Sequence, residues 1–127
     1  MARKTKRFIK QGDEPLNHEW LIEMFLEYLK AEGKTAKTLK NYESDLRIFF
    51  SWYEKNAFFK GKPKGFEKIK VQDIIKLQAK LLEDGMSINR YSRLKSVVSS
   101  LSNYCECVLS EDEDFEEYKN FRNICNK

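Results

Sequence analysis

Hydrophobic side chains recur at helical spacing along the first half of the chain. Asn17 is a suitable N-cap for a first helix that ends at Gly33, and its apolar positions lie three or four residues apart: Leu21, Met24, Phe25, Tyr28 and Leu29. Thr35 can cap a second helix that runs to about Lys55 on a longer apolar stripe: Leu39, Tyr42, Leu46, Phe49, Phe50 and Tyr53. Each pattern predicts an amphipathic helix that buries one face.

The second half of the chain repeats this pattern. A third helix is predicted from about Val71 to Glu83, before Gly85, on these apolar positions: Val71, Ile74, Ile75, Leu81 and Leu82. Ser87 can cap a fourth helix whose apolar face continues for about five turns. That face comprises Tyr91, Leu94, Val97, Val98, Leu101, Tyr104, Cys105 and Val108. A weaker segment from Phe115 to Ile124 would add a short fifth helix.

Residues 56–69 interrupt the helical pattern. They are predicted to form a loop, with Phe58, Phe59 and Phe66 available to hold its ends against the core. No stretch alternates apolar and polar residues for long enough to predict a strand, and five Gly and two Pro are too few for a many-stranded fold. The chain is therefore predicted to be all-α, a compact bundle of four main helices to which the short fifth can be added.

The predicted organisation along the chain has three parts. Residues 1–16 form a flexible basic arm, and residues 17–110 form the helical domain. Residues 111–127 form an acidic segment, a short helix and the start of a linker.

Composition excludes several classes of function. No apolar run is long enough for a membrane span, and no hydrophobic region of a secretory signal follows the basic N-terminus, so we expect a cytoplasmic protein. Cys105, Cys107 and Cys125, with the single histidine, lack the spacing of zinc ligands; we expect free thiols, no metal and no cofactor. His18 is predicted to be solvated near the start of the first helix. No phosphate-binding glycine motif and no nucleophile–histidine arrangement predicts an active site.

The net charge of +4 is unevenly distributed. Residues 1–10 carry +5 and residues 34–70 carry +6, whereas residues 11–33 carry −5 and residues 111–127 carry −3. Such a distribution suits a polyanionic partner, and a lysine-rich solvated surface is the alternative explanation.

Two polar surfaces bear on this choice. The face of the fourth helix opposite its apolar stripe carries short polar residues and one arginine: Asn89, Ser92, Arg93, Ser96, Ser99, Ser100 and Asn103. Such a face permits close approach of either a DNA groove or another helix. The start of the second helix carries bases and hydroxyls where free N–H groups favour a phosphate: Lys34, Thr35, Lys37, Thr38, Lys40 and Asn41. Together the two surfaces favour a nucleic acid.

The succession of these elements resembles the N-terminal core-binding (SAM-like) domain of phage integrases and other tyrosine recombinases. The first half of the resemblance lies in the end of the first helix and the Gly33–Tyr42 segment, followed by Asp45-Leu46 and Phe49. The second half lies in residues 69–74 and in Gly85-Met86-Ser87, followed by Arg93-Leu94. The resemblance covers about residues 17–110.

The resemblance implies a non-catalytic domain that binds duplex DNA through the second and fourth helices. It points to Thr35, Lys37, Thr38, Asn41, Ser87, Asn89, Arg90, Arg93 and Ser96, to which charge adds Lys34 and Lys40. It places the catalytic residues, including the tyrosine nucleophile, on a separate catalytic domain of the full-length protein, which would be a tyrosine recombinase. The full-length protein is expected to oligomerise on DNA, and the isolated domain to be monomeric.

A different class of function also accounts for the polar face of the fourth helix. A helical protein–protein interaction module would pack its Ser/Asn face on a partner helix and would not bind DNA. Binding to duplex DNA distinguishes the two hypotheses.

Overall fold

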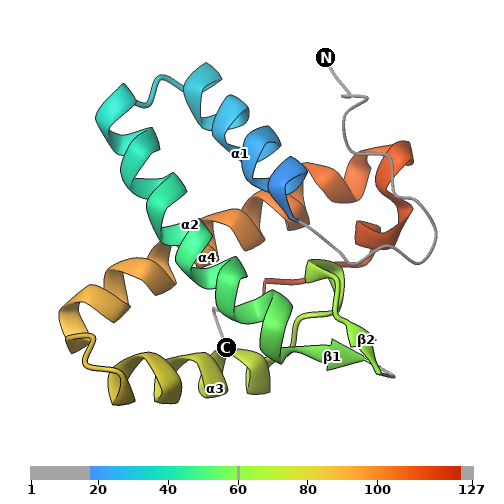
Figure 1. Ribbon diagram of the computed structural model, residues 1–127. Helices are drawn as coiled ribbons and strands as arrows, with labels where there is room; N and C mark the ends of the chain where they lie inside the picture. Colours follow the sequence, from blue (N-terminus) through green and yellow to red (C-terminus); the bar gives the residue numbers. More distant parts are fainter. Residues whose placement is uncertain (1–17, 60, 124–127) are drawn as a thin grey trace.

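Four helices form a bundle in the computed structural model, as predicted. They are α1 (Glu19–Ala31), α2 (Ala36–Asn56), α3 (Val71–Glu83) and α4 (Ile88–Cys107). The structure describes residues 18–59 and 61–123. Helices α1 and α2 form an antiparallel pair, α4 passes behind α2, and α3 lies beneath the end of α2 (Figure 1). The predicted basic arm, residues 1–16, lies outside the described residues.

Two glycines end helices in a conformation that other residues rarely adopt. Gly33 follows α1 with φ of 96°, and the next N–H, that of Lys34, returns to the carbonyl of Leu29 at 3.1 Å. Gly85 follows α3 in the same way, with φ of 104°. This left-handed residue satisfies carbonyls at the helix end and reverses the chain, which lets α2 fold back on α1 and α4 on α3.

The apolar stripes of α1, α2 and α4 form one core. Leu21, Leu46, Phe49, Leu94 and Leu101 are all fully buried. The predicted stripe of α4 therefore faces inward as expected, with only Val108 at its end partly buried.

The predicted stripe of α3 is only partly correct. Ile74 is buried and so is Leu77, which the prediction omitted, but Ile75 is 59% exposed and Val71 is also exposed. Because α3 lies along one edge of the bundle, it buries a narrow face at spacings of three and four residues, with Leu81 and Leu82 partly buried against the core and Val71 and Ile75 in solvent.

The loop between α2 and α3 contains a small hairpin. β1 (Phe58–Phe59) pairs antiparallel with β2 (Lys62–Pro63), and a 3-10 turn, η2 (Phe66–Lys68), follows. Two-residue strands have no detectable sequence period, so no strand was predicted. Phe66 is fully buried and holds the loop to the core as expected. Phe58 is 53% exposed, so the expectation for it is wrong; the side chain of Phe59 lies outside the described part.

A buried ion pair joins this hairpin to α3. Lys64 Nζ lies 2.7 Å from Asp73 Oδ2, and both side chains are 8% exposed. The same Asp73 oxygen accepts the backbone N–H of Lys70 at 2.9 Å, just before α3 begins. The carboxylate therefore fixes the loop and the start of the helix together.

The segment after α4 packs onto the same core. It forms two 3-10 turns, η3 (Leu109–Glu111) and η4 (Glu113–Tyr118), in place of the predicted short helix. Four of its apolar side chains are buried: Leu109, Phe115, Tyr118 and Phe121. The ring of Phe115 stacks on Trp20 of α1 with centroids 5.4 Å apart. The exposed acidic residues of this segment are therefore interspersed with apolar side chains that pack in the core.

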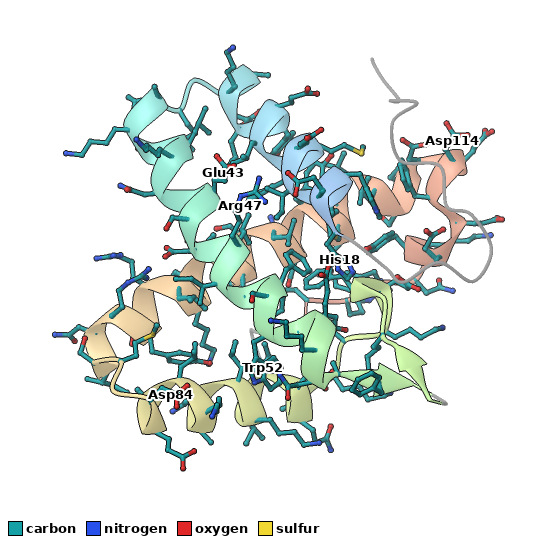
Figure 2. The ribbon with its side chains drawn as sticks, in the orientation of Figure 1. His18, Glu43, Arg47, Trp52, Asp84 and Asp114 are labelled. Carbon is teal, nitrogen blue, oxygen red and sulfur yellow. The ribbon has the colours of Figure 1, made fainter. Side chains whose placement is uncertain are left out.

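His18 corrects a sequence-based prediction, because it is buried and not solvated. Figure 2 shows it in the middle of the molecule. Its Nδ1 lies 2.7 Å from Glu54 Oε2, its Nε2 accepts the backbone N–H of Phe66 at 3.2 Å, and its ring stacks on Phe50. The hydrogen-bond partners of the ring lie more than thirty residues away in the sequence, so no local sequence pattern predicts them. This residue, not Asn17, occupies the N-cap position of α1.

Candidate nucleic-acid interface

The start of α2 presents positive charge and free polar groups to solvent. Thr35 caps the helix by accepting the backbone N–H of Thr38 at 3.2 Å, as predicted, and its hydroxyl donates to that of Thr38 at 3.1 Å. The first turn contains no acidic residue. The predicted bases and amide here are exposed, and Thr38 is half-buried: Lys34, Lys37, Thr38, Lys40 and Asn41. The positive end of the helix dipole and three lysines therefore act on the same surface.

The start of α4 has a similar construction. Ser87 caps the helix by accepting the backbone N–H of Arg90 at 3.0 Å, and the first turn again contains no acidic residue. Asn89, Arg93 and Ser96 are exposed. Both cap hydroxyls thus hold their helix ends, and the longer side chains beyond them reach into solvent.

A short ion pair joins these two helices. Arg90 Nη2 in the first turn of α4 lies 2.6 Å from Asp45 Oδ1 in the middle of α2. Thr38 and Asn41 precede Asp45 by seven and four residues, so they share its side of α2, along which the pair lies about 15 Å from Thr35. The polar residues Thr35, Thr38 and Asn41 therefore form a stripe along α2 that leads toward the start of α4.

The candidate residues do not all lie on this surface. Two candidates do lie on it: Arg93 is one turn beyond Arg90 on α4, and Lys37 is one turn before Asn41 on α2. Lys40 precedes Arg47 by seven residues and shares the side of α2 that faces α1. Within the described part of the chain, neither Lys37 nor Arg93 pairs with a carboxylate.

Sequence reasoning missed the role of Asp45. It is an acidic residue next to the apolar stripe of α2, and such a position signals a buried partner. Its partner lies in another helix and could not be paired with it from the sequence alone.

The polar face of α4 divides into two parts. Its first half, with Asn89, Ser92 and Ser96, is exposed. Its second half lines a cleft of about 410 Å³ between α4 and the α1–α2 turn, with Tyr28 and Lys34 on the opposite wall. The residues of α4 in this cleft are Ser99, Ser100, Asn103, Tyr104 and Cys107. The second half of the face therefore lies across the cleft from Lys34, whereas the first half lies beside the middle of α2.

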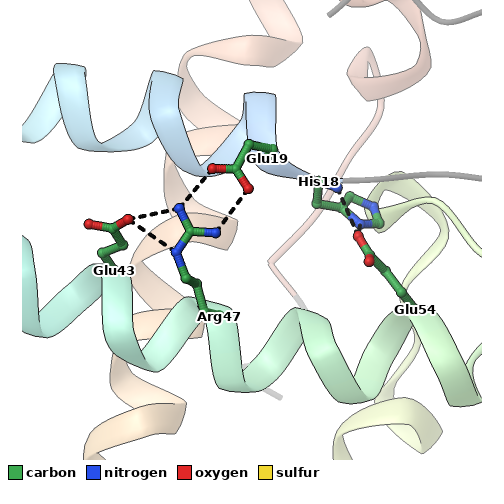
Figure 3. A network of polar contacts seen from close by, with 5 residues as sticks. All are labelled: His18, Glu19, Glu43, Arg47 and Glu54. Carbon is green, nitrogen blue, oxygen red and sulfur yellow. Dashed lines mark hydrogen bonds and ion pairs between the residues drawn. The ribbon is translucent and has the colours of Figure 1, made fainter.

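The side of α2 that faces α1 is held by a separate ion-pair network. The Arg47 guanidinium donates to Glu19 at 2.7 and 2.9 Å and to Glu43 at 2.7 and 3.1 Å (Figure 3). The hydrogen bonds with Arg47 hold the pKa of Glu19 below its usual value, although burial opposes this, and the hydrogen bonds with Glu19 and Glu43 raise the pKa of Arg47. Arg47 is therefore committed to joining the two helices.

Three buried tyrosines are unsuited to nucleophilic chemistry. Burial, with nearby carboxylates, raises the pKa of Tyr53, and burial likewise raises the pKa of Tyr104 and Tyr118. Tyr28 is exposed and Tyr42 is half-buried, so the expectation that both belong to the core is wrong; they stand at the cleft instead. A raised pKa keeps a phenol protonated and weakens it as a nucleophile.

Residues 18–59 and 61–123 contain neither a cluster of metal-ligating side chains nor a membrane-spanning helix. In that part of the chain, no group of three or more His, Cys, Asp or Glu side chains is placed to hold a metal ion. None of its helices combines the length and apolar character needed to cross a membrane.

Comparison with known proteins agrees with this architecture. Residues 22–104 match the family described as "Phage integrase, N-terminal SAM-like domain". The SPbeta prophage-derived recombinase-like protein YomM of Bacillus subtilis (strain 168) is 36% identical over 118 residues, which are 92% of this chain and 33% of that protein. The chain thus spans about a third of the length of this relative. No solved structure matches the chain. Because the matched region contains all of α2 and α3 and most of α1 and α4, this chain belongs to the phage integrase N-terminal SAM-like domain family.

Proposed function

We propose that this chain binds duplex DNA through the first halves of α2 and α4, as the non-catalytic grip of a site-specific tyrosine recombinase. The observation that carries the proposal is the Asp45–Arg90 contact, which puts the start of α4 beside the exposed polar stripe of α2. Membership of an integrase family and the recombinase-like name of the relative support it.

The two helices contribute different kinds of contact. Lys34 and Lys37 attract backbone phosphates, and the uncompensated start of α2 adds its dipole. Lys40, on the side of α2 that faces α1, adds only long-range attraction. On α4, Asn89, Arg93 and Ser96 are short or forked donors suited to base edges in the major groove. Thr38 and Asn41 add hydrogen bonds, whereas Thr35 and Ser87 act indirectly, by holding the helix starts that face the DNA.

Phosphate neutralisation sets the strength of this binding. Three cations at the interface, Lys34, Lys37 and Arg93, release about three counterions, which gives a slope of about −3 for log affinity against log salt. A single domain without further contacts binds weakly, with a dissociation constant on the order of 10⁻⁴ to 10⁻⁶ M.

The rest of the recombination reaction lies outside this chain in the proposal. A catalytic domain of the full-length protein would cut and rejoin the DNA through a tyrosyl-phosphate link, and copies of that protein would assemble on the recombination site. This domain alone is monomeric and works with DNA in the cytoplasm. Its contribution is grip, orientation and part of the choice of site.

The experiment compares alanine variants with matched controls on the same helices. Binding of the full chain to a fluorescent duplex of mixed sequence is followed by anisotropy at several salt concentrations. Lys37→Ala is matched by Lys55→Ala, about 27 Å further along α2. Arg93→Ala is matched by Lys95→Ala, on the other side of α4. Lys37→Ala and Arg93→Ala should each weaken binding and reduce the slope by about 0.9, and the controls should not.

Two results would overturn the proposal. Absence of binding by the wild-type chain would favour the protein-interaction module. Equal affinity of all five proteins would show that other bases, such as those in residues 1–16, bind the DNA. Selection from random duplexes tests specificity: if Arg93 reads a guanine, its loss should relax the preference at one position by about 1–3 kcal/mol.

A further inference from the structure

Arg90 is a base on the proposed DNA surface, but its guanidinium is already engaged. Nη2 lies 2.6 Å from the Asp45 carboxylate, whose side chain is 4% exposed, and the Arg90 side chain is 27% exposed. Its other terminal nitrogen, Nη1, is buried and has no hydrogen-bond partner among the described residues. A phosphate oxygen would have to compete with Asp45 for Nη2, and Nη1 would have to leave its buried position to reach a phosphate.

We infer that Arg90 is a positioning residue, held by Asp45, and not a contact to the DNA backbone. The inference rests on the proposed DNA-binding function and divides its bases into two groups. Lys37 and Arg93 contact DNA, whereas Arg90 sets the distance between the helices that carry them.

Arg90 is held at both ends. Its backbone N–H donates to the Ser87 cap at 3.0 Å, and its side chain reaches Asp45 on α2. The first turn of α4 is therefore fixed to the middle of α2 through one residue. Because Arg93 lies one turn further on, its place relative to Lys37 depends on this link.

The ion pair with Asp45 also cancels the contribution of Arg90 to the electrostatic attraction between the chain and DNA. A carboxylate and a guanidinium in contact have no net charge, so Arg90 displaces no counterion when DNA binds. Conversion of Asp45 to Asn removes the negative charge and leaves a weaker neutral acceptor. The guanidinium then becomes available to a phosphate, at the expense of the fixed spacing.

The test measures salt dependence and thermal stability in the full chain with a duplex of mixed sequence. The variants are Arg90→Gln, Asp45→Asn, the double variant and, as the reference for a true contact, Arg93→Ala. Arg90→Gln should lower the melting temperature and leave the salt slope at the wild-type value, while Arg93→Ala reduces the slope by about 0.9. Asp45→Asn should steepen the slope by about 0.9, and adding Arg90→Gln should abolish that gain. A purely structural role would not produce this gain.

Other outcomes separate this inference from the function on which it rests. If Arg90→Gln reduces the slope as Arg93→Ala does and the melting temperature is unchanged, Arg90 contacts DNA and the inference is wrong, although the function stands. If the wild-type chain binds no duplex, the proposed function fails, and melting temperatures alone then test the link between Arg90 and Asp45. If the loss in the double variant equals the sum of the losses in the two single variants, the link is overturned. If it is smaller than that sum, the link is supported. If a single variant does not fold, the double variant, which buries no lone charge, supplies the slope, and a value below wild type overturns the inference.

Discussion

The Glu54 carboxylate binds His18 twice, through the ring Nδ1 at 2.7 Å and through the backbone N–H at 2.8 Å (Figure 3). This joins the residue before α1 to the last part of α2. The other ring nitrogen accepts the Phe66 N–H at 3.2 Å, so one imidazole holds three segments together.

Loss of the His18 ring should therefore destabilise the whole bundle. His18→Ala leaves the buried Phe66 N–H without an acceptor, which costs about 1–3 kcal/mol, and also removes the stacking on Phe50. Urea unfolding followed by circular dichroism measures the loss. Lys119→Ala, at an exposed position, is the control. A midpoint equal to that of the control would show that the contacts of the ring have no energetic role.

The same pair predicts a dependence of stability on pH. Burial raises the pKa of Glu54, but the hydrogen bonds from His18 outweigh this and hold the pKa below its usual value. A carboxylate whose folded pKa is lowered stabilises the fold above its unfolded pKa, about 4.5, and that stabilisation is lost as pH falls through the folded pKa. Thermal melts from pH 6 to pH 3 (about the range of carboxylate titration) should show a smaller loss in Glu54→Gln than in wild type. Parallel curves would contradict the assignment.

Leu101 lies where α4 packs on the core, so truncating its side chain should leave a cavity that destabilises the fold. Leu101 is fully buried, and Leu101→Ala should reduce the free energy of unfolding by about 2–4 kcal/mol. Ser92→Ala, on the exposed face of the same helix, should be neutral or slightly stabilising because alanine has the higher helix propensity. Similar stability of the two variants would mean that the faces of α4 are wrongly assigned.

Two buried tyrosines should respond in opposite directions to loss of the hydroxyl. Tyr53 donates its hydroxyl to the Gly65 carbonyl at 2.9 Å, so Tyr53→Phe should cost about 1 kcal/mol. The Tyr118 hydroxyl is buried and has no partner among the described residues, so Tyr118→Phe should be neutral or stabilising by up to about 1 kcal/mol. Differential scanning calorimetry of both variants checks the signs. A destabilised Tyr118→Phe would reveal a partner for that hydroxyl.

The amino-acid sequence by itself determined the four helices and the caps of α2 and α4. The apolar stripes of α2 and α4 and the caps Thr35 and Ser87 are local properties, because helix geometry and capping depend on residues a few positions apart. The same local signals carry the family resemblance. The sequence also located the polar residues at the starts of α2 and α4, since charge and side-chain length can be read directly.

Tertiary structure alone decided which polar residues meet. The pairs His18–Glu54 and Asp45–Arg90 join residues 36 and 45 positions apart, and many other partners have the same charge. Burial of Ile74 but not Ile75 likewise depends on the edge of the bundle that α3 covers. Such choices arise from the packing of whole helices, which brings distant side chains into a dry interior where an unsatisfied polar group is costly.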